Sequence, residues 1–312
     1  MYLCRNFNRI MVKVSVILPV YNVASYLDEA FQSLIQQSLR EIEIIAINDG
    51  ATDNSQEYID KYMALDPRIK CVKQVNQGLS GARNSGIRLI QGEYVYFMDS
   101  DDIIETDALE TCYYYAKHND ADVCLFDAKL FYENNAKQVP WNYDRSKFLI
   151  ENHKYQGKDL FNNLIDKEQH RAVVWLQFIK GDYLKKLNLT FFPGIIHEDE
   201  LFTPQLLLQT ENIYYLNKKF IKHRVRSSSI QGGGYSKRNI NCYLTVIDEL
   251  LKWQNTPIIQ KFAKYTLSKV FYTGHQIPFK EKFGVFWRAV RSGYLKYIGW
   301  KSAFVFWFKR KN

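Results

Sequence analysis

The chain of 312 residues has only five cysteines, which are odd in number, far apart and free of any CxxC or Cys/His cluster. This pattern indicates neither a disulfide framework nor a zinc site, and it favours a reducing, cytosolic compartment. An apolar core of signal-peptide length is also missing, because Arg5 and Arg9 interrupt the first ten residues. We expect residues 1–11 to form a leader, with Met11 as an alternative start and the first strand beginning near Val12.

Two phosphate-binding motifs are absent as well. The sequence contains no GxxxxGK[ST] loop, and no GxGxxG follows the first apolar run. These absences argue against a P-loop enzyme and against a nicotinamide dehydrogenase. A phosphate-bearing ligand would therefore need a metal and side chains to balance its charge.

Acidic residues are scarce at the C-terminal end. Residues 280–312 hold nine Lys or Arg against one acid, Glu281, so +8 of the net charge of +9 lies there. Residues 283–308 interleave aromatic with basic side chains, and the longest uncharged stretch near the end, SAFVFWF, is far shorter than the ~20 residues that span a bilayer.

This basic aromatic tail is typical of a segment that lies on an anionic membrane surface. We therefore expect a cytoplasmic protein that is peripheral on the inner face of the plasma membrane. Ordinary core helices with solvated charges are the alternative interpretation of the same residues. We expect no nucleic acid as a partner, since no recognised nucleic-acid module accompanies the tail.

The first third of the chain alternates apolar runs with helical patterns. The first helix is expected to begin at Ser25, whose hydroxyl would cap it together with Asp28 three residues on. Four such alternations predict an α/β fold with a doubly wound, mostly parallel sheet. The predicted strands are residues 14–20, 42–48, 69–75 and 93–98.

The pattern weakens beyond about residue 130, and no sharp boundary is visible. We predict one domain over residues 12–230, followed by a helical, basic and aromatic extension over residues 231–312. In open α/β sheets ligands bind beyond the carboxyl ends of the strands. The unusual residues of this chain lie there: Pro19–Asn22, Asn48–Gly50 and Asp99–Asp102.

Three carboxylates occupy four positions directly behind the fourth predicted strand, at Asp99, Asp101 and Asp102. Their hard oxygens suit Mg²⁺ or Mn²⁺, which usually keep room for substrate phosphates. The alternative is a polar loop in which Asp102 or Thr106 caps a helix. The position at a strand end favours a divalent cation site.

Five motifs, in this order and spacing, resemble bacterial glycosyltransferase family 2. They are SVILPVYNVASYLDEAFQSLIQQSL, INDGATDNS, QGLSGARNSGI, YFMDSDD and HEDELF. The resemblance is specific over about residues 13–105, looser to about residue 230 and absent in the tail. It implies the GT-A fold, with a Rossmann-like sheet, a nucleotide-binding half over about 12–105 and an acceptor half over about 106–230.

The resemblance also implies roles for residues that bind a sugar nucleotide. Asp99 would contact the ribose and Asp101 would bind Mn²⁺ or Mg²⁺ on the diphosphate, with Ser100 between them. Asp49 would accept a hydrogen bond from uracil, and Arg83 would lie beside the base, roles that suit a carboxylate and a planar guanidinium. The nucleotide pocket would be lined by Pro19, Tyr21 and Asn22.

The same resemblance makes Asp199 the catalytic base, with Glu198 beside it. A base for inverting transfer must come from a segment other than the one that grips the diphosphate, and Asp199 lies 98 residues beyond Asp101. The alternative is that both acids only complement a helix dipole.

The resemblance also implies contacts with the acceptor or the diphosphate at Trp175, Glu198 and Arg226. Trp175 would touch the acceptor, with a core aromatic as the alternative. Arg226 would close over the diphosphate together with Arg224 and Ser229, with a solvated basic loop as the alternative.

The resemblance therefore implies an inverting enzyme that moves a hexose or N-acetylhexosamine from a UDP-sugar. Its acceptor would be a glycan or lipid-linked saccharide of a bacterial surface polysaccharide: capsule, O-antigen or lipooligosaccharide. Two alternatives are a non-catalytic sugar-nucleotide binding protein on the same fold and a nucleotidyltransferase. The intact DSD and ED motifs argue against the first, and the missing phosphate-cradling loop argues against the second.

Overall fold

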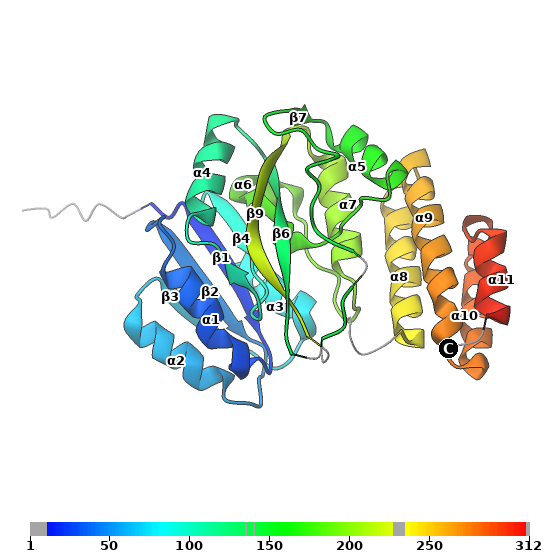
Figure 1. Cartoon of the computed structure of the whole chain (residues 1–312), viewed down its shortest axis with the longest axis horizontal. Coiled ribbons are helices and arrows are strands. Elements are labelled where there is room, and N and C mark those ends of the chain that lie inside the picture. The colour runs from blue at the N-terminus through cyan, green and yellow to red at the C-terminus, as the bar shows by residue number, and fades with distance from the viewer. Residues whose placement is uncertain (1–10, 135, 140, 227–234, 310–312) are drawn as a thin grey trace, which may run out of the picture.

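The predicted βα alternation is present in the computed structural model of the chain (Figure 1). The structure describes residues 11–134, 136–139, 141–226 and 235–309. The predicted leader, apart from Met11, lies outside these residues, as do Ser229 and the predicted domain boundary at residue 230.

A central sheet organises the fold. Its order is β3-β2-β1-β4-β8-β6-β9-β5, and β7 pairs with β9. The strands are β1 (Val14–Val20), β2 (Ile42–Asn48), β3 (Ile69–Lys73), β4 (Tyr94–Phe97), β5 (Ile103–Ile104), β6 (Val123–Tyr132), β7 (Lys154–Tyr155), β8 (Gln177–Lys180) and β9 (Ile213–Val225).

The two halves of the sheet differ in direction. The first four strands of the chain pair in parallel, which confirms the prediction for this half. β8 is antiparallel to both β4 and β6, whereas β6 and β9 are parallel. β8 thus joins the parallel half to the strands that follow residue 105, where no periodicity marked them in the sequence.

Helices cover both faces of the sheet. The helices of the described residues are α1 (Ala24–Ile35), α2 (Ser55–Leu65), α3 (Gly78–Ile87), α4 (Ala108–His118), α5 (Gly157–Asp166), α6 (Gly181–Leu187), α7 (Asp199–Gln209), α8 (Lys237–Trp253), α9 (Pro257–Thr273), α10 (Phe279–Arg291) and α11 (Trp300–Phe308), with 3-10 turns at Val174–Leu176, Gly274–Gln276 and Tyr294–Tyr297.

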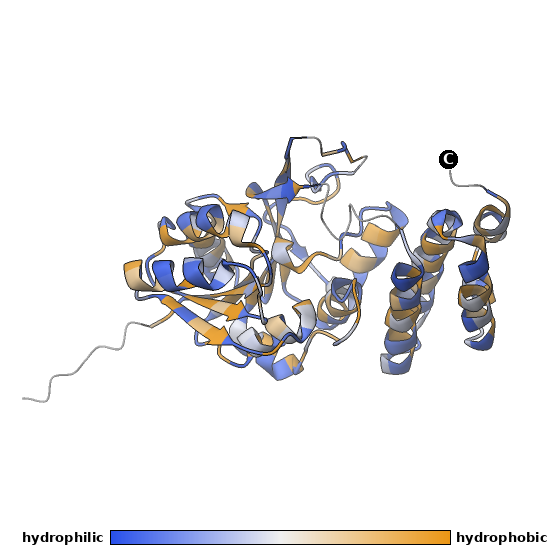
Figure 2. Ribbon diagram, turned by 90° about the horizontal axis from the view of Figure 1, so that it is seen from below, coloured by the Kyte–Doolittle hydropathy of each residue, from blue (hydrophilic) through white to orange (hydrophobic). Residues whose placement is uncertain are grey.

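Two hydrophobic cores lie on opposite faces of this sheet. Val16 of β1 packs in the core that contains residues of α1, α2 and α4, whereas its neighbour Ile17 packs in the core that contains residues of α3, α5 and α7. Successive side chains of a strand point to opposite faces, so a strand covered on both sides must be apolar throughout. Hydrophobic residues accordingly colour the strands of the parallel half (Figure 2).

The start of α1 differs from the prediction. The helix begins at Ala24, and no side chain of its own caps it, so the predicted cap at Ser25 is wrong. The backbone N–H of Val23 donates to Ser55 Oγ at 3.2 Å, and that of Ala24 donates to Asp53 Oδ2 at 2.9 Å. A neighbouring segment therefore supplies the acceptors that a helix N-terminus needs.

The C-terminal helices extend the molecule on the side away from β3 (Figure 1). α8 packs against α7, α9 packs against α8, and α11 packs against α9. This arrangement confirms a helical C-terminal region. In the part of the chain that the structure describes, no helix is both long and apolar enough to cross a membrane.

Candidate active site

The predicted nucleotide segments meet at the carboxyl ends of β1 and β2. Asp49 N donates to Val20 O at 2.9 Å, which ties the two strand ends together. Asn22 has a positive φ of 51°, and its side-chain Oδ1 accepts from Thr52 N at 2.8 Å. Pro19 is buried within β1, whereas Tyr21 is 48% exposed and open to a ligand.

Asp49 directly follows β2 at this edge of the sheet and is buried, with 2% of its surface exposed. Its Oδ1 accepts from Gln74 Nε2 at 2.7 Å and from Gln77 N at 2.9 Å. Gly50 follows with a positive φ of 71°, and a Cβ there would lie 3.0 Å from Asn76 N. Glycine therefore lets the chain turn tightly beneath the carboxylate.

Arg83 of α3 joins the DSD and ED segments. This arginine is 1% exposed. One of its terminal nitrogens donates to Asp99 Oδ1 at 2.9 Å, and the other donates to Glu198 Oε1 and Asp199 Oδ1, both at 2.8 Å. Phe191 lies under the guanidinium, with its ring centroid 5.1 Å from Cζ.

The contacts of Arg83 with three carboxylates were not expected from the sequence. Burial lowers the pKa of the guanidinium, but the three carboxylates outweigh burial and hold that pKa above its ordinary value. The predicted contact of Arg83 with the uracil ring of the nucleotide stays a prediction. What the structure adds is that Arg83 brings the acids of two distant segments to one point.

Asp199 stands at the first residue of α7, as a helical interpretation of HEDELF predicts. Its Oδ2 accepts from Val174 N at 3.2 Å. Burial raises the pKa of Asp199 to about 7, Arg83 opposes that rise, and the carboxylates of Glu198 and Asp99 add to it. A general base works best when its pKa lies near the working pH, so Asp199 suits that role.

The other acids of the DSD segment pair with the end of β9. Arg226 holds Asp101 Oδ2 at 2.8 Å, and Arg224 Nε donates to the Asp101 carbonyl at 2.9 Å. Asp102 is 1% exposed and accepts from Arg224 N at 2.9 Å, with His223 Nδ1 also at 2.9 Å.

Asp102 is therefore not a helix cap. α4 begins at Ala108, and its cap position is Asp107, which makes no side-chain capping bond. The alternative in which Asp102 or Thr106 caps that helix is wrong, because no side chain caps α4. Both carboxylate oxygens of Asp102 instead contact residues of β9. Burial raises the pKa of Asp102 to about 6, and His223 opposes that rise.

The fit of a divalent cation can be judged from these contacts. The described residues contain no group of three or more His, Cys, Asp or Glu side chains placed to hold a metal. Mg²⁺ needs fewer, because it commonly binds through one or two carboxylates together with substrate phosphates. Asp101 fits such a site, since its side chain is 18% exposed, and Arg226, which pairs with its Oδ2, occupies part of the place that a cation would take.

Trp175 and Ser100 are both buried. Trp175 is 3% exposed and stacks on His223, with ring centroids 4.7 Å apart. This position favours the core interpretation of Trp175. His223 and Phe191 are the residues that sequence reasoning missed, and no local pattern marks either of them.

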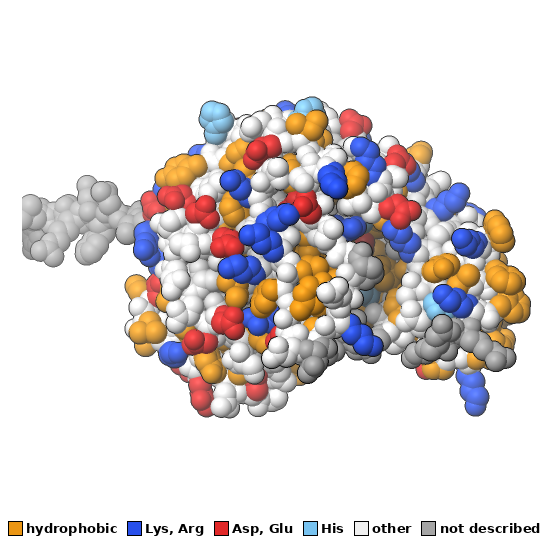
Figure 3. Space-filling model, in the orientation of Figure 1, with side chains coloured by type: hydrophobic (Ala, Val, Ile, Leu, Met, Phe, Trp, Pro, Cys, Tyr) orange, Lys and Arg blue, Asp and Glu red, His pale blue; other side chains and the backbone are white. Residues whose placement is uncertain are grey.

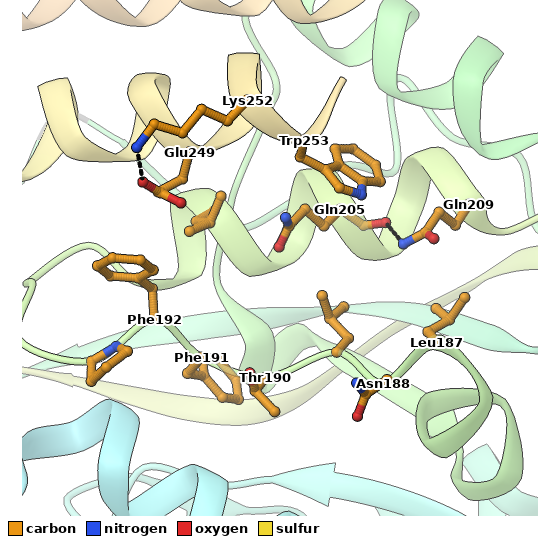
Figure 4. Close-up of a pocket in the computed structure, with 13 residues that line it drawn as sticks. Leu187, Asn188, Thr190, Phe191, Phe192, Gln205, Gln209, Glu249, Lys252 and Trp253 are labelled. Carbon is orange, nitrogen blue, oxygen red and sulfur yellow. Dashed lines mark hydrogen bonds and ion pairs between the residues drawn. The ribbon is translucent and has the colours of Figure 1, made fainter. Parts of the chain in front are cut away.

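A cavity of about 550 Å³ lies away from these residues, between the loop before α7, α7 itself and α8 (Figure 4). Phe191 belongs to both places, because its ring also lies under Arg83. Figure 4 shows the Lys252–Glu249 ion pair of 2.8 Å on the α8 side. The cavity is lined by Leu187, Asn188, Leu189, Thr190, Phe191, Phe192, Pro193, Leu201, Gln205, Gln209, Glu249, Lys252 and Trp253. None of the predicted site residues is in its lining.

Known proteins share this sequence pattern and this fold. The family model described as Glycosyl transferase family 2 matches residues 15–177. "Glycosyltransferase GlyA" of Streptococcus pneumoniae is 33% identical over 222 residues, which are 70% of this chain and 31% of GlyA. This chain thus spans about a third of the length of GlyA.

Two further similarities cover more of the matched protein. An "Uncharacterized glycosyltransferase" of Haemophilus influenzae is 45% identical over 204 residues, which are 62% of this chain and 70% of that protein. The crystal structure of S. aureus TarS 1-349 in complex with UDP-GlcNAc has a TM-score of 0.70 at 19% identity, over 94% of this chain and 83% of that one. The structural likeness shows a shared GT-A fold, and the family match over half of the sequence shows that this chain belongs to glycosyltransferase family 2.

Proposed function

We propose that this protein is an inverting, metal-dependent glycosyltransferase that moves a hexose or N-acetylhexosamine from a UDP-sugar to a hydroxyl group. The observation that carries the proposal is the contact of Arg83 with both Asp99 and Asp199, at 2.9 and 2.8 Å. It puts the acid expected to act as a base beside the segment expected to hold the donor. A UDP-sugar is supported by the TarS structure, which contains UDP-GlcNAc.

Asp199 is the proposed base. With a pKa of about 7, its carboxylate can accept a proton from the acceptor hydroxyl near neutral pH. Arg83 and Val174 N fix its two oxygens, and each oxygen keeps a second lone pair for the proton. The deprotonated hydroxyl attacks the anomeric carbon from the face opposite the leaving diphosphate, so an α-linked donor yields a β-glycoside.

The DSD and nucleotide segments would hold the donor. Asp49 would accept from uracil, and Asp99 would accept from a ribose hydroxyl. A divalent cation bound through Asp101 would neutralise negative charge on the leaving diphosphate. Tyr21 and Asn22, which are exposed directly after β1, would line the nucleotide pocket.

A direct assay tests the reaction. Purified full-length protein is incubated with Mn²⁺, a panel of UDP-sugars and lipid-linked acceptors, and UDP release is measured. Asp199→Asn should lower the rate by about 10²–10⁴-fold, the usual range for loss of a general base. Glu200→Gln is the matched control, since Glu200 is the next acid of the same helix turn.

Each other outcome identifies a different function. Equal rates for Asp199→Asn and the wild type would refute the assigned base and leave both acids as helix-dipole partners. Pyrophosphate as product would favour a nucleotidyltransferase. UDP-sugar binding without any transfer across the panel would favour a binding protein on the same fold.

We also infer attachment to an anionic inner membrane surface through the C-terminal extension. Six large aromatic side chains, termed the aromatic face, point outward with exposures of 56% to 84%. Ring contacts of Trp307 with Phe279 and Phe283 join the two helices that carry this face. The aromatic face is formed by Phe279, Phe283 and Trp287 of α10 and by Trp300, Phe304 and Phe308 of α11.

Basic side chains accompany the aromatic face. Lys280, Lys301 and Lys309 are exposed on the same helices or directly after them. Figure 3 shows hydrophobic side chains along the outer edge of the extension, with basic ones among them. Near an anionic leaflet each basic residue contributes about 1 kcal/mol, and aromatic rings suit the headgroup region. A lipid-linked acceptor of surface polysaccharide synthesis would lie in that membrane.

Vesicle flotation tests the attachment. A Trp287→Ser, Trp300→Ser double variant should float less with phosphatidylglycerol vesicles than the wild type does. Leu65→Ser is the matched control, because Leu65 is 64% exposed but belongs to α2. Equal flotation of the double variant and the wild type would end the membrane proposal. A size change without a flotation change would favour self-association through the aromatic face.

A further inference from the structure

Arg226 occupies the carboxylate that is expected to bind the metal. One of its terminal nitrogens lies 2.8 Å from Asp101 Oδ2, and the two side chains are 19% and 18% exposed. An oxygen in direct contact with a guanidinium cannot coordinate a cation from the same side. Arg226 must therefore release Oδ2 before that oxygen can ligate an ion.

Asp101 is the one acid of the DSD segment whose cation stands at the rim. Asp99 is bound by Arg83, which is 2% exposed. Asp102 is held by His223 and by the backbone of Arg224. Arg83 and Asp102 are both almost fully buried, so breaking these contacts would leave a charged group inside the protein, which is costly. The side chains of Arg226 and Asp101 each keep about a fifth of their surface exposed, so this pair is only partly desolvated and costs less to break than the contacts of Arg83 or Asp102.

The surroundings of Arg226 let it move without disturbing β9. Arg224, two residues earlier, anchors the strand end through Asp101 O at 2.9 Å and Glu29 at 3.0 Å. Arg226 itself stacks on Tyr26 at 4.8 Å, and its Nε has no hydrogen-bond partner among the described residues. Among the described residues its ion pair is thus with Asp101, and its contact with the Tyr26 ring does not require a fixed direction of the terminal nitrogens.

We propose that the Arg226 guanidinium exchanges partners. It pairs with Asp101 before the donor binds, and it pairs with the nucleoside diphosphate once a divalent ion is bound by Asp101. This inference rests on the proposed metal and donor of the same site. Its consequence is that metal and nucleotide bind cooperatively. Arg226 competes with a divalent ion for the Asp101 carboxylate, because it occupies Oδ2 and repels a second cation at the same group. A diphosphate would offer the released guanidinium a new anionic partner, so it would weaken this competition.

The size of the coupling can be bounded. Couplings between two bound ligands are typically 5- to 150-fold, and each ligand changes the affinity of the other by the same factor. We expect UDP to tighten Mn²⁺ binding by about tenfold or more in the wild type. In Arg226→Gln, Mn²⁺ alone should bind about tenfold more tightly, and the effect of UDP should shrink by a similar factor.

Mn²⁺ titration followed by electron paramagnetic resonance, without and with UDP, tests this on the full-length protein. Arg226→Lys is the conservative variant, since it keeps a cation, and its Mn²⁺ affinity should stay near that of the wild type. Lys222→Gln is the matched control, because Lys222 lies in β9 four residues before Arg226 but pairs with Glu105. In the background of Asp101→Asn, Arg226→Gln should no longer change Mn²⁺ affinity.

The outcomes separate this inference from the proposed function. Unchanged Mn²⁺ affinity in Arg226→Gln, with transferase activity present in the wild type, would overturn the exchange alone. Tighter Mn²⁺ binding in Arg226→Gln, together with no transferase activity in the wild type, would support the exchange and count against the proposed enzyme activity. Mn²⁺ binding to neither protein, even with UDP, would overturn both. Melting temperatures of all variants verify that they fold.

Discussion

Two arginines neutralise acids of this site in opposite environments. Arg83 is enclosed and binds three carboxylates that come from two distant segments. Arg226 stands at the rim and binds one carboxylate, with both side chains nearly a fifth exposed. Arg83 is buried, so losing its ion pairs would leave an unpaired charge inside the protein, and the three contacts therefore fix the geometry of the site. The Arg226–Asp101 pair is partly exposed and costs less to break, so Arg226 can exchange its partner.

The largest expected effect comes from the enclosed arginine. Arg83→Met should destabilise the protein by about 3–5 kcal/mol, because Glu198, Asp199 and Asp99 would lose the cation that balances them. Urea unfolding measures this loss. Arg88→Met is the matched control on the adjoining turn and should change stability by less than about 0.5 kcal/mol. Equal, small losses in both variants would contradict the role of Arg83.

Asp102 extends the comparison to the second cluster of acids. Asp102→Ala should cost about 1–3 kcal/mol, because Arg224 N and His223 would lose a buried acceptor. The exposed Asp107→Ala, at a helix cap without a side-chain bond, should stay within about 0.5 kcal/mol. Differential unfolding of the two variants is the measurement. A stability loss at Asp107 as large as that at Asp102 would show that the buried contacts of Asp102 contribute no more than an exposed acid does.

The pH dependence of the rate probes the charges around Arg83. Asp199 must be deprotonated to act as a base, and its pKa is raised to about 7, so kcat/KM should fall about tenfold per pH unit below 7 and level off above. Glu198→Gln removes a neighbouring negative charge that raises this pKa. Its rate profile should therefore shift to lower pH. A profile that moves to higher pH instead would show that Glu198 does not raise the pKa of Asp199.

The smallest expected effect on stability is at the rim. Arg226→Gln should lower the free energy of unfolding by about 1–2 kcal/mol, between the values for exposed and for buried ion pairs, because both side chains of the pair are partly exposed. Urea unfolding of Arg226→Gln and Arg83→Met, side by side, measures the difference between the two ion-pair environments. A loss of about 3 kcal/mol at Arg226 would mean that this pair is structural and would remove the physical basis for exchange.

The local sequence pattern predicted the parallel half of the sheet correctly. It gave wrong predictions where residues distant in the sequence supply the contacts. The runs at residues 14–20 and 42–48 became β1 and β2 with the predicted bounds, because burial on both faces demands continuous apolar sequence. Ser25 looked like a cap, yet Ser55 and Asp53 of the next loop accept those bonds. The strands after residue 105 gave no clear periodicity, since β9 has one half-exposed stretch among buried residues.

The sequence by itself determined the ligand edge, because the chain direction of parallel strands forces their carboxyl ends, and hence Asn22, Asp49 and Asp99, to one side of the sheet. It also determined the family, through motifs whose order is local information. How the charges are shared depends instead on the folded arrangement. The contact of Arg83 with Asp199 spans 116 positions, and that of Arg226 with Asp101 joins β9 to a different loop. Such pairs depend on side-chain reach across a folded sheet, which no spacing in the sequence encodes.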